Sequence, residues 1–175
     1  MSANYLSPKA HVRADSDGWG SYAVEPIAAG ETVAAFGGQC VSRAALEVLQ
    51  DGSAAQAVQI DDDLFLVTPI TTVPADTVGH SCAPNCGIAG GVLIVAMHDI
   101  AAGARLSYDH AMTTGCDFNE FECACAAPTC RHKVTGHDWM IPELQLAYRG
   151  YFSPYLAKRI SSLVRIGAER RAFAL

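Results

Sequence analysis

The sequence lacks long apolar runs and is poor in charged residues. No stretch of its 175 residues approaches the roughly 18 to 20 consecutive apolar residues that a membrane-spanning helix needs. Residues 1–18 also lack the apolar segment of a secretory signal. We therefore expect no membrane association and a cytoplasmic protein, or a nuclear one if the source is eukaryotic. Because 50% of the residues are hydrophobic and 17% are charged, the composition excludes a disordered chain and predicts one domain with a core.

Basic residues are scarce, and they are unevenly distributed. Residues 149–175 hold six of the twelve basic residues and one acid, a balance of +5. Residues 1–148 hold six basic and seventeen acidic residues, a balance of −11. An acidic body repels phosphate groups and attracts cations, so direct nucleic-acid binding is not expected and a cationic substrate is compatible. A solvated acidic surface without such a role is the alternative.

Seven cysteines are the most informative residues that are present. In a chain without an export signal we expect reduced thiols, which bind a metal or fill small spaces in the core. Cys123 and Cys125 are followed, after four residues, by Cys130, and three thiolates at this spacing can converge on a tetrahedral zinc ion. Cys82 is the candidate for the fourth ligand, with Cys86 as its rival. The thiols expected in the core are Cys40, Cys86 and Cys116.

Short β-prone segments separated by glycines occupy the first part of the chain. Such segments lie within residues 14–38, and further strands are expected at residues 64–67 and 92–97. A helix is expected from Ser42, as the cap, to about Gln50, with Gly52 at its end. This part of the sequence therefore predicts many short strands and one short helix.

The pattern becomes helical after Asp138. Pro142 suits the start of a short helix, and Ser153-Pro154 suits the cap and first turn of a longer amphipathic helix. This helix could pack on the domain, pair in a homodimer, or bind a membrane surface or another partner. The sequence thus predicts a mainly β domain with a helical C-terminal extension.

Four motifs together resemble those of SET-domain lysine methyltransferases in order and spacing. They are Gly18-Trp19-Gly20, His80-Ser81-Cys82-Ala83-Pro84-Asn85, Leu106-Ser107-Tyr108-Asp109-His110, and Cys123-x-Cys125-x4-Cys130. The resemblance covers the chain from about Lys9 to Lys133. It implies the SET-domain β-clip fold, in which two distant segments form a pseudoknot beside the active site. The implied organisation is a SET domain at 9–117, a zinc-binding post-SET segment at 118–137 and a helical C-terminal extension at 138–175.

The resemblance also implies S-adenosylmethionine as the methyl donor and one structural zinc ion per chain. The backbone of Gly18, Trp19 and Gly20 would hold the methionine end of the donor, where glycine allows close approach. Gly79 and His80 would belong to the cofactor segment, with His80 at the adenine. Trp139 or Val134 would cover the adenine, although a core-packing role suits Trp139 equally. The implied zinc ligands are Cys82, Cys123, Cys125 and Cys130.

The site departs from the family pattern at three places. His110 occupies the position of the catalytic tyrosine, while Tyr108 occupies the position that tunes how many methyl groups fit. Gly79 stands where an asparagine is expected, and Ala35-Phe36 stands in place of a Glu-Tyr pair. The candidate catalytic residues are therefore Tyr108 and His110.

Three interpretations of these departures stay open. The first is a methyltransferase that acts on a lysine side-chain amine of a protein or peptide, with Tyr108 or another tyrosine supplying the hydroxyl. It could instead act on a small-molecule amine, with His110 as base or proton shuttle. The third interpretation is an inactive SET-fold module that binds the cofactor or forms a homodimer through its C-terminal helices.

Overall fold

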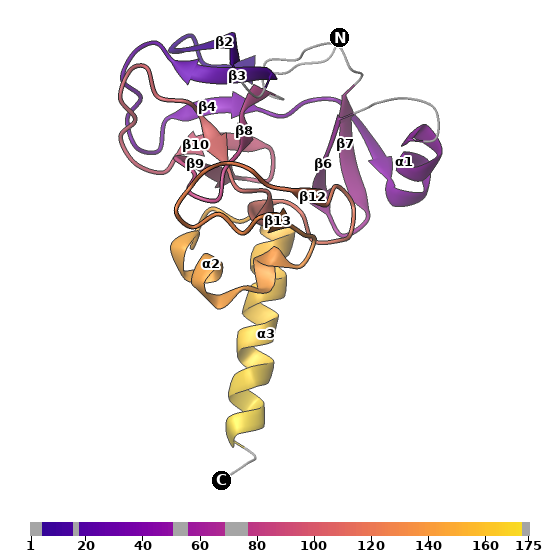
Figure 1. Cartoon of the computed structure of the whole chain (residues 1–175). Helices are drawn as coiled ribbons and strands as arrows, with labels where there is room; N and C mark the ends of the chain where they lie inside the picture. Colours follow the sequence, from indigo (N-terminus) through magenta and orange to yellow (C-terminus); the bar gives the residue numbers. More distant parts are fainter. Residues whose placement is uncertain (1–4, 16–17, 51–55, 69–76, 173–175) are drawn as a thin grey trace.

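The computed structural model describes residues 5–15, 18–50, 56–68 and 77–172. Short strands form most of the regular structure, and the longest helix lies at the C-terminal end (Figure 1). The strands are β1 (Tyr5–Leu6), β2 (Ala10–Asp15), β3 (Gly18–Ala23), β4 (Thr32–Ala35), β5 (Gln39–Ser42), β6 (Gln56–Asp61), β7 (Leu64–Thr68), β8 (Gly79–His80), β9 (Cys86–Ala89), β10 (Leu93–Ala96), β11 (Ser107–Tyr108), β12 (Phe121–Glu122) and β13 (Lys133–Val134). The helices are α1 (Arg43–Gln50), α2 (Pro142–Ala147) and α3 (Pro154–Ala172), with 3-10 turns η2 (His110–Met112) and η3 (Asp138–Met140). The predicted mainly β fold with a helical C-terminal piece is confirmed.

The described strands pair in several small sheets instead of one large sheet. The largest has four strands in the order β1-β4-β10-β9, and a second has three in the order β5-β7-β6. Two antiparallel hairpins, β2–β3 and β12–β13, lie beside them. The remaining pair, β8 with β11, is parallel and sets Gly79 opposite Ser107 and His80 opposite Tyr108. This pairing joins two motifs that are distant in the sequence.

The C-terminal extension shares the core of the strands. Leu156 in the first turns of α3 is fully buried in the same apolar cluster as Ile88 and Ile94 of the large sheet. At Gly87 a Cβ atom would lie 2.6 Å from the ring of Tyr151, so only glycine permits this close approach. The Ile88 N–H also donates to the Tyr151 carbonyl at 3.1 Å. The segment that precedes α3 is thus bound to β9, whereas the far end of α3 projects from the body (Figure 1).

Most elements expected from the sequence are present. The segments 64–67 and 92–97 correspond to β7 and β10, and the first expected helix corresponds to α1, although Gly52 lies outside the described residues. Pro142 and Pro154 begin α2 and α3 as expected, because a proline loses no hydrogen bond in the first turn. The expectation for Cys40 is wrong, since its thiol is exposed on the outer strand β5. None of the helices in the described residues is long and apolar enough to cross a membrane.

The burial of α3 predicts how two leucine substitutions on one helix will differ. We expect Leu156→Ala to lower the free energy of unfolding by about 2 to 5 kcal/mol, because it leaves a cavity in the core. The matched control Leu163→Ala, on the exposed part of α3, should change it by less than about 0.5 kcal/mol. Urea denaturation followed by circular dichroism measures both. Equal effects of the two substitutions would contradict the docking of α3 on the body.

Candidate active site and metal centre

Five rings gather where β8 and β11 end. His80 and Tyr108 are held side by side by the parallel pair, and His110 follows at the start of η2. The ring of His110 lies 5.2 Å from that of His80 and 5.1 Å from that of Tyr108, between centroids. Phe121 of β12 contacts both imidazoles at 5.3 Å, and Phe36 contacts Tyr108 at 5.7 Å. Segments far apart in the sequence therefore build one aromatic cluster.

A cavity of about 330 Å³ opens beside this cluster. Tyr108 and His110 line it together with Phe36 and Phe118, and strand β6 contributes another part of its wall. None of the described residues that line it is acidic. The cavity therefore combines aromatic rings with neutral polar groups, and the attraction of a cation by the acidic body would act from outside it.

The two imidazoles of the cluster are neutral at neutral pH. Burial, reinforced by the nearby His80, lowers the pKa of His110 to about 4. Burial also lowers the pKa of His80, although Asp109 acts in the opposite direction. The backbone N–H of His110 donates to Nδ1 of His80 at 3.3 Å, so the proton of the neutral His80 ring is on Nε2. This nitrogen faces the Cys82 sulfur at 3.3 Å.

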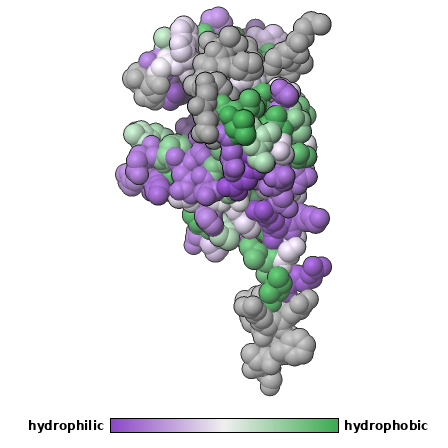
Figure 2. Space-filling model, turned by 90° about the vertical axis from the view of Figure 1, so that its right-hand side faces the viewer, coloured by the Kyte–Doolittle hydropathy of each residue, from purple (hydrophilic) through white to green (hydrophobic). Residues whose placement is uncertain are grey.

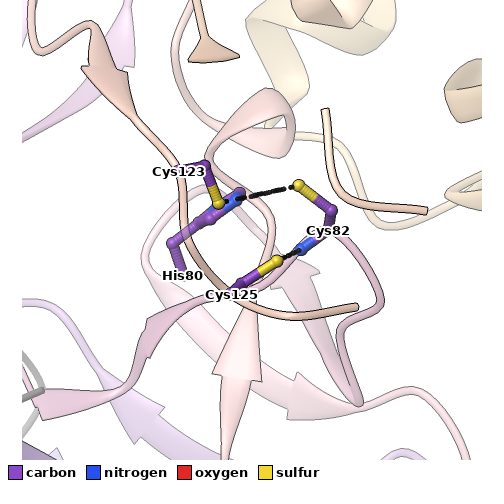
Figure 3. Close-up of side chains that lie close together, drawn as sticks. All are labelled: His80, Cys82, Cys123 and Cys125. Atoms are coloured by element: carbon purple, nitrogen blue, oxygen red, sulfur yellow. Dashed lines mark hydrogen bonds between the residues drawn. The ribbon is translucent and has the colours of Figure 1, made fainter. Parts of the chain in front are cut away.

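Four potential metal ligands, one of them His80, lie close together next to the aromatic cluster. The Nε2 or Nδ1 atom of His80 and the sulfur atoms of Cys82, Cys123 and Cys125 all lie within 4.8 Å of one another, and Figure 3 shows these side chains around a common centre. The sulfurs of Cys82 and Cys123 are 3.9 Å apart. Two thiolates bound to one tetrahedral zinc at 2.3 Å would be separated by about 3.8 Å. The donor set and its spacing fit a structural zinc ion.

Backbone amides adjust the acidity of these thiols. Burial alone would raise the pKa of Cys125, but hydrogen bonds from the backbone N–H groups of Cys82 and Ala127 bring it down to about 6. Burial raises the pKa of the Cys82 thiol to about 12. Because a bound zinc ion requires thiolates, its binding at Cys82 must release a proton.

The glycine motif near the N-terminus lies on β3. At Gly20 a Cβ atom would be 2.7 Å from Oδ2 of Asp15 and 3.0 Å from Nε of Arg105, so these charged groups lie directly over the glycine backbone. A Cβ atom at Gly79 would also have Arg105 as its nearest neighbour, with Nη2 at 3.7 Å. The segments that contain Gly20 and Gly79 therefore converge at Arg105, where Gly20 is buried beneath these side chains and Gly79 is half-buried. The partly exposed pair of opposite charges beside both glycine segments fits the polar end of S-adenosylmethionine.

Several curated relatives of the chain are named as histone-lysine methyltransferases. A protein named histone-lysine N-methyltransferase, H3 lysine-4 specific, from Eremothecium gossypii is 30% identical over 150 residues, which cover 75% of this chain and 15% of the relative. The protein of the same name from Yarrowia lipolytica is 30% identical over 71% of this chain and 12% of its own length. A histone-lysine N-methyltransferase of Dictyostelium discoideum is 25% identical over 70% of this chain and 9% of its own length. The chain belongs to the SET-domain lysine methyltransferase family.

This SET-domain chain thus spans at most 15% of the length of these relatives. No protein-family model matches it. The family assignment rests on the relatives together with the ordered motifs, of which the three after the glycine motif meet in one aromatic and thiol-rich region.

The structure assembles part of the metal set expected for this SET-domain chain. Cys82, Cys123 and Cys125 converge, whereas Cys130 lies beside them and its thiol donates a hydrogen bond to the Cys123 carbonyl at 3.4 Å. His80 occupies the fourth place in the cluster. A metal-bound histidine binds the ion through an unprotonated nitrogen and commonly donates a hydrogen bond through the other one. In His80, however, Nδ1, the nitrogen remote from the sulfurs, accepts a hydrogen bond from the His110 N–H. This tautomer suits a hydrogen bond to the Cys82 thiolate better than a bond to zinc, so Cys130 stays the predicted fourth ligand.

Two other expected cofactor residues lie apart from the cavity of His110. Trp19 is 61% exposed on β3. Trp139 is buried in the main core, lies 5.7 Å from the Arg159 guanidinium and lines a separate cavity of about 530 Å³. Val134 is buried against the metal thiols. The role of covering the adenine remains a prediction for either Trp139 or Val134.

Sequence reasoning missed Arg131 as the residue that joins the thiol segment to the catalytic strand. Both of its terminal nitrogens donate to Asp109 at 2.7 Å, and its Nε donates to Asp138 at 2.8 Å. Tyr148 adds a hydrogen bond to Asp109 at 3.0 Å. Asp109 is fully buried and also caps η2 through the Ala111 N–H. A basic residue directly after Cys130 was the one sequence signal for this network.

The thiol cluster predicts about one zinc per chain, measurable by elemental analysis of the purified protein. We expect Cys125→Ser to lose most of this zinc, because three protein ligands bind it much more weakly than four. The matched control Cys40→Ser removes an exposed thiol and should keep the zinc.

Two further variants identify the fourth ligand. We expect Cys130→Ser to lose zinc and His80→Gln to retain it, since the tautomer of His80 suits a donor. Retention of zinc in Cys130→Ser with loss in His80→Gln would instead make His80 the ligand.

Proposed function

We propose that the chain transfers a methyl group from S-adenosylmethionine to a lysine side-chain amine of a protein. The observation that carries the proposal is the parallel β8–β11 pair, which fixes the cofactor motif at His80 beside Tyr108 and His110 in the cavity wall. The relatives are named as histone-lysine methyltransferases, which supports histone H3 as the first protein substrate to test. The acidic balance of residues 1–148 favours the approach of a cationic lysine-rich segment.

The cavity can prepare a lysine amine for the reaction. When bound, S-adenosylmethionine supplies a methyl group on a sulfonium, which an unprotonated amine can displace. The rings of Phe36, Tyr108 and His110 exclude water, and desolvation of the ammonium lowers its pKa. A phenol and nearby carbonyls can orient the amine and hold the methyl group by weak CH···O contacts. Positioning in a water-poor site supplies most of the rate.

His110 supplies a different chemistry from the tyrosine that the family pattern expects. With its pKa near 4, the imidazole is too weak a base to hold a lysine proton at neutral pH, but its unprotonated nitrogen can accept a hydrogen bond from the amine. We therefore assign His110 to orienting the amine lone pair, with the proton leaving to water. The low pKa argues against the role of base or proton shuttle for His110, so in the second candidate function, methylation of a small-molecule amine, the ring would orient the amine in the same way.

Methyl transfer tests the assignment. With radiolabelled donor, the chain should methylate histone H3 or an H3 peptide, and His110→Ala should lower kcat by about 100-fold because the amine loses its orienting group. His98→Ala, at an exposed histidine, is the matched control and should leave kcat unchanged. His110→Tyr, which restores a hydroxyl, should retain more activity than His110→Ala.

The other interpretations predict different results. Transfer to a small amine but to no protein or peptide would replace the protein substrate by the second candidate. Binding of neither donor nor substrate would leave a catalytically inactive module.

We also propose that α3 docks on a second copy of the chain. Val164 is an exposed apolar residue on the projecting part of α3, where Figure 2 shows hydrophobic surface. A groove of about 570 Å³ between α2 and α3, lined by Leu146 and Val164, continues this surface. Residues 149–175 carry +5 and residues 1–148 carry −11, so the helix of one copy is attracted by the body of another.

Sedimentation equilibrium tests the dimer. The wild-type chain should form a dimer that weakens as salt screens the opposite charges. Val164→Glu should shift it to the 18.5 kDa monomer, whereas Val48→Glu, on the exposed surface of α1, should not. A wild-type chain that stays monomeric at all concentrations contradicts this partner.

A further inference from the structure

Arg105 lies where the two segments of the expected cofactor site meet. Its Nε is 3.0 Å from the place of a Cβ atom on Gly20, and its Nη2 is 3.7 Å from the corresponding place on Gly79. The Asn85 side-chain amide donates to the Arg105 carbonyl at 2.8 Å, and Tyr22 forms a β-bridge with Arg105. The backbone of Arg105 is therefore held in place, and its guanidinium lies over both glycines.

Asp15 completes a pair of opposite charges at this position. Its Oδ2 is 3.3 Å from Nε of Arg105 and accepts a hydrogen bond from the Tyr22 hydroxyl at 2.7 Å. The side chains of Arg105 and Asp15 are 36% and 14% exposed, so solvent reaches the pair. The same Asp15 oxygen lies 2.7 Å from the place of a Cβ atom on Gly20. A cation and an anion thus stand side by side over the buried Gly20, and part of each side chain is open to solvent.

We propose that Arg105 and Asp15 recognise the zwitterionic amino-acid end of the methyl donor. The Arg105 guanidinium binds the α-carboxylate, and the Asp15 carboxylate binds the α-ammonium group. A guanidinium offers several N–H donors in one plane and matches a carboxylate well, which makes it the stronger anchor of the two. This inference rests on the proposed function, since it names residues that bind the same methyl donor.

The position of Arg105 also explains how the donor site can have a glycine instead of an asparagine at residue 79. The resemblance expects an asparagine amide at residue 79, directed at the cofactor, and glycine provides none. Nη2 of Arg105 is the nearest atom to the space that such a side chain would enter, so the guanidinium supplies the missing N–H donor. A contact of 3.7 Å is ordinary van der Waals distance, so a Cβ atom at residue 79 meets no clash with Arg105 and Gly79→Asn can be tested. The two donors are therefore exchangeable in a variant.

Calorimetry with two donors tests the carboxylate site. The probes are S-adenosylmethionine and its decarboxylated form, which keeps the sulfonium and the ammonium but lacks the α-carboxylate. The zinc-loaded wild-type chain should bind S-adenosylmethionine about 10- to 100-fold more tightly, as expected for hydrogen bonds between charged groups. Arg105→Gln should reduce this preference to about threefold or less, and Arg105→Lys should give an intermediate preference.

Further variants separate the two halves of the site. Asp15→Asn should weaken the binding of both donors by a similar factor, because both keep the ammonium. Arg105→Gln combined with Gly79→Asn should recover part of the preference for the carboxylate. Arg43→Gln, which removes one positive charge from α1, is the matched control and should keep the wild-type preference. Thermal unfolding by circular dichroism confirms that each variant is folded.

Each outcome has a separate meaning. If Arg105→Gln and Arg105→Lys are folded and keep the full wild-type preference, the assignment of Arg105 is overturned while the proposed function stands. Equal affinity of the wild-type chain for both donors overturns it as well. If the wild-type chain binds neither donor, the proposed function itself fails.

Discussion

The buried ion pair between Arg131 and Asp109 is the interaction on which the site depends. The guanidinium binds both oxygens of a fully buried carboxylate at 2.7 Å, and its third nitrogen binds Asp138. Such a pair offsets the large desolvation penalty of its charges only through good geometry, and removal of one partner typically costs about 3 to 5 kcal/mol. Three segments meet in it: the thiol segment, the strand end before His110, and the C-terminal extension through Tyr148. Its geometry therefore determines where His110 lies.

His80 extends this connection from the metal centre to the cavity. One ring nitrogen accepts from the backbone of His110, and the other faces the Cys82 sulfur. A zinc ion at the thiols would thus act as a structural element, because it holds the loop of Arg131 and the cofactor motif together without touching the reacting atoms. A metal that organises a pocket in this way influences activity through folding, since ligand deprotonation and loop ordering are coupled.

Local pattern was enough to predict the elements, and motif order was enough to predict the family, but neither specifies which side chains meet across the fold. The starts of α2 and α3 follow from proline chemistry at Pro142 and Pro154. The spacing of Cys123 and Cys125 was enough to bring these two thiols together, but Cys130 lies outside the ligand cluster. The pairing of Arg131 with Asp109 and of Arg105 with Asp15 depends on how segments distant in the sequence meet in the fold, for which no local signal exists. Such contacts, with the neutral state of His110, could only be found in the structure.

The central claim is that one cavity presents a lysine amine to a donor held between the glycine segments and His80. A crystal structure with S-adenosylhomocysteine and a lysine peptide tests it most directly. The account predicts that the homocysteine end lies at Gly18–Gly20 and Gly79 and that the amine enters the cavity beside Tyr108 and His110, facing the sulfur. A product bound elsewhere, or a cavity closed off from the sulfur, would contradict it.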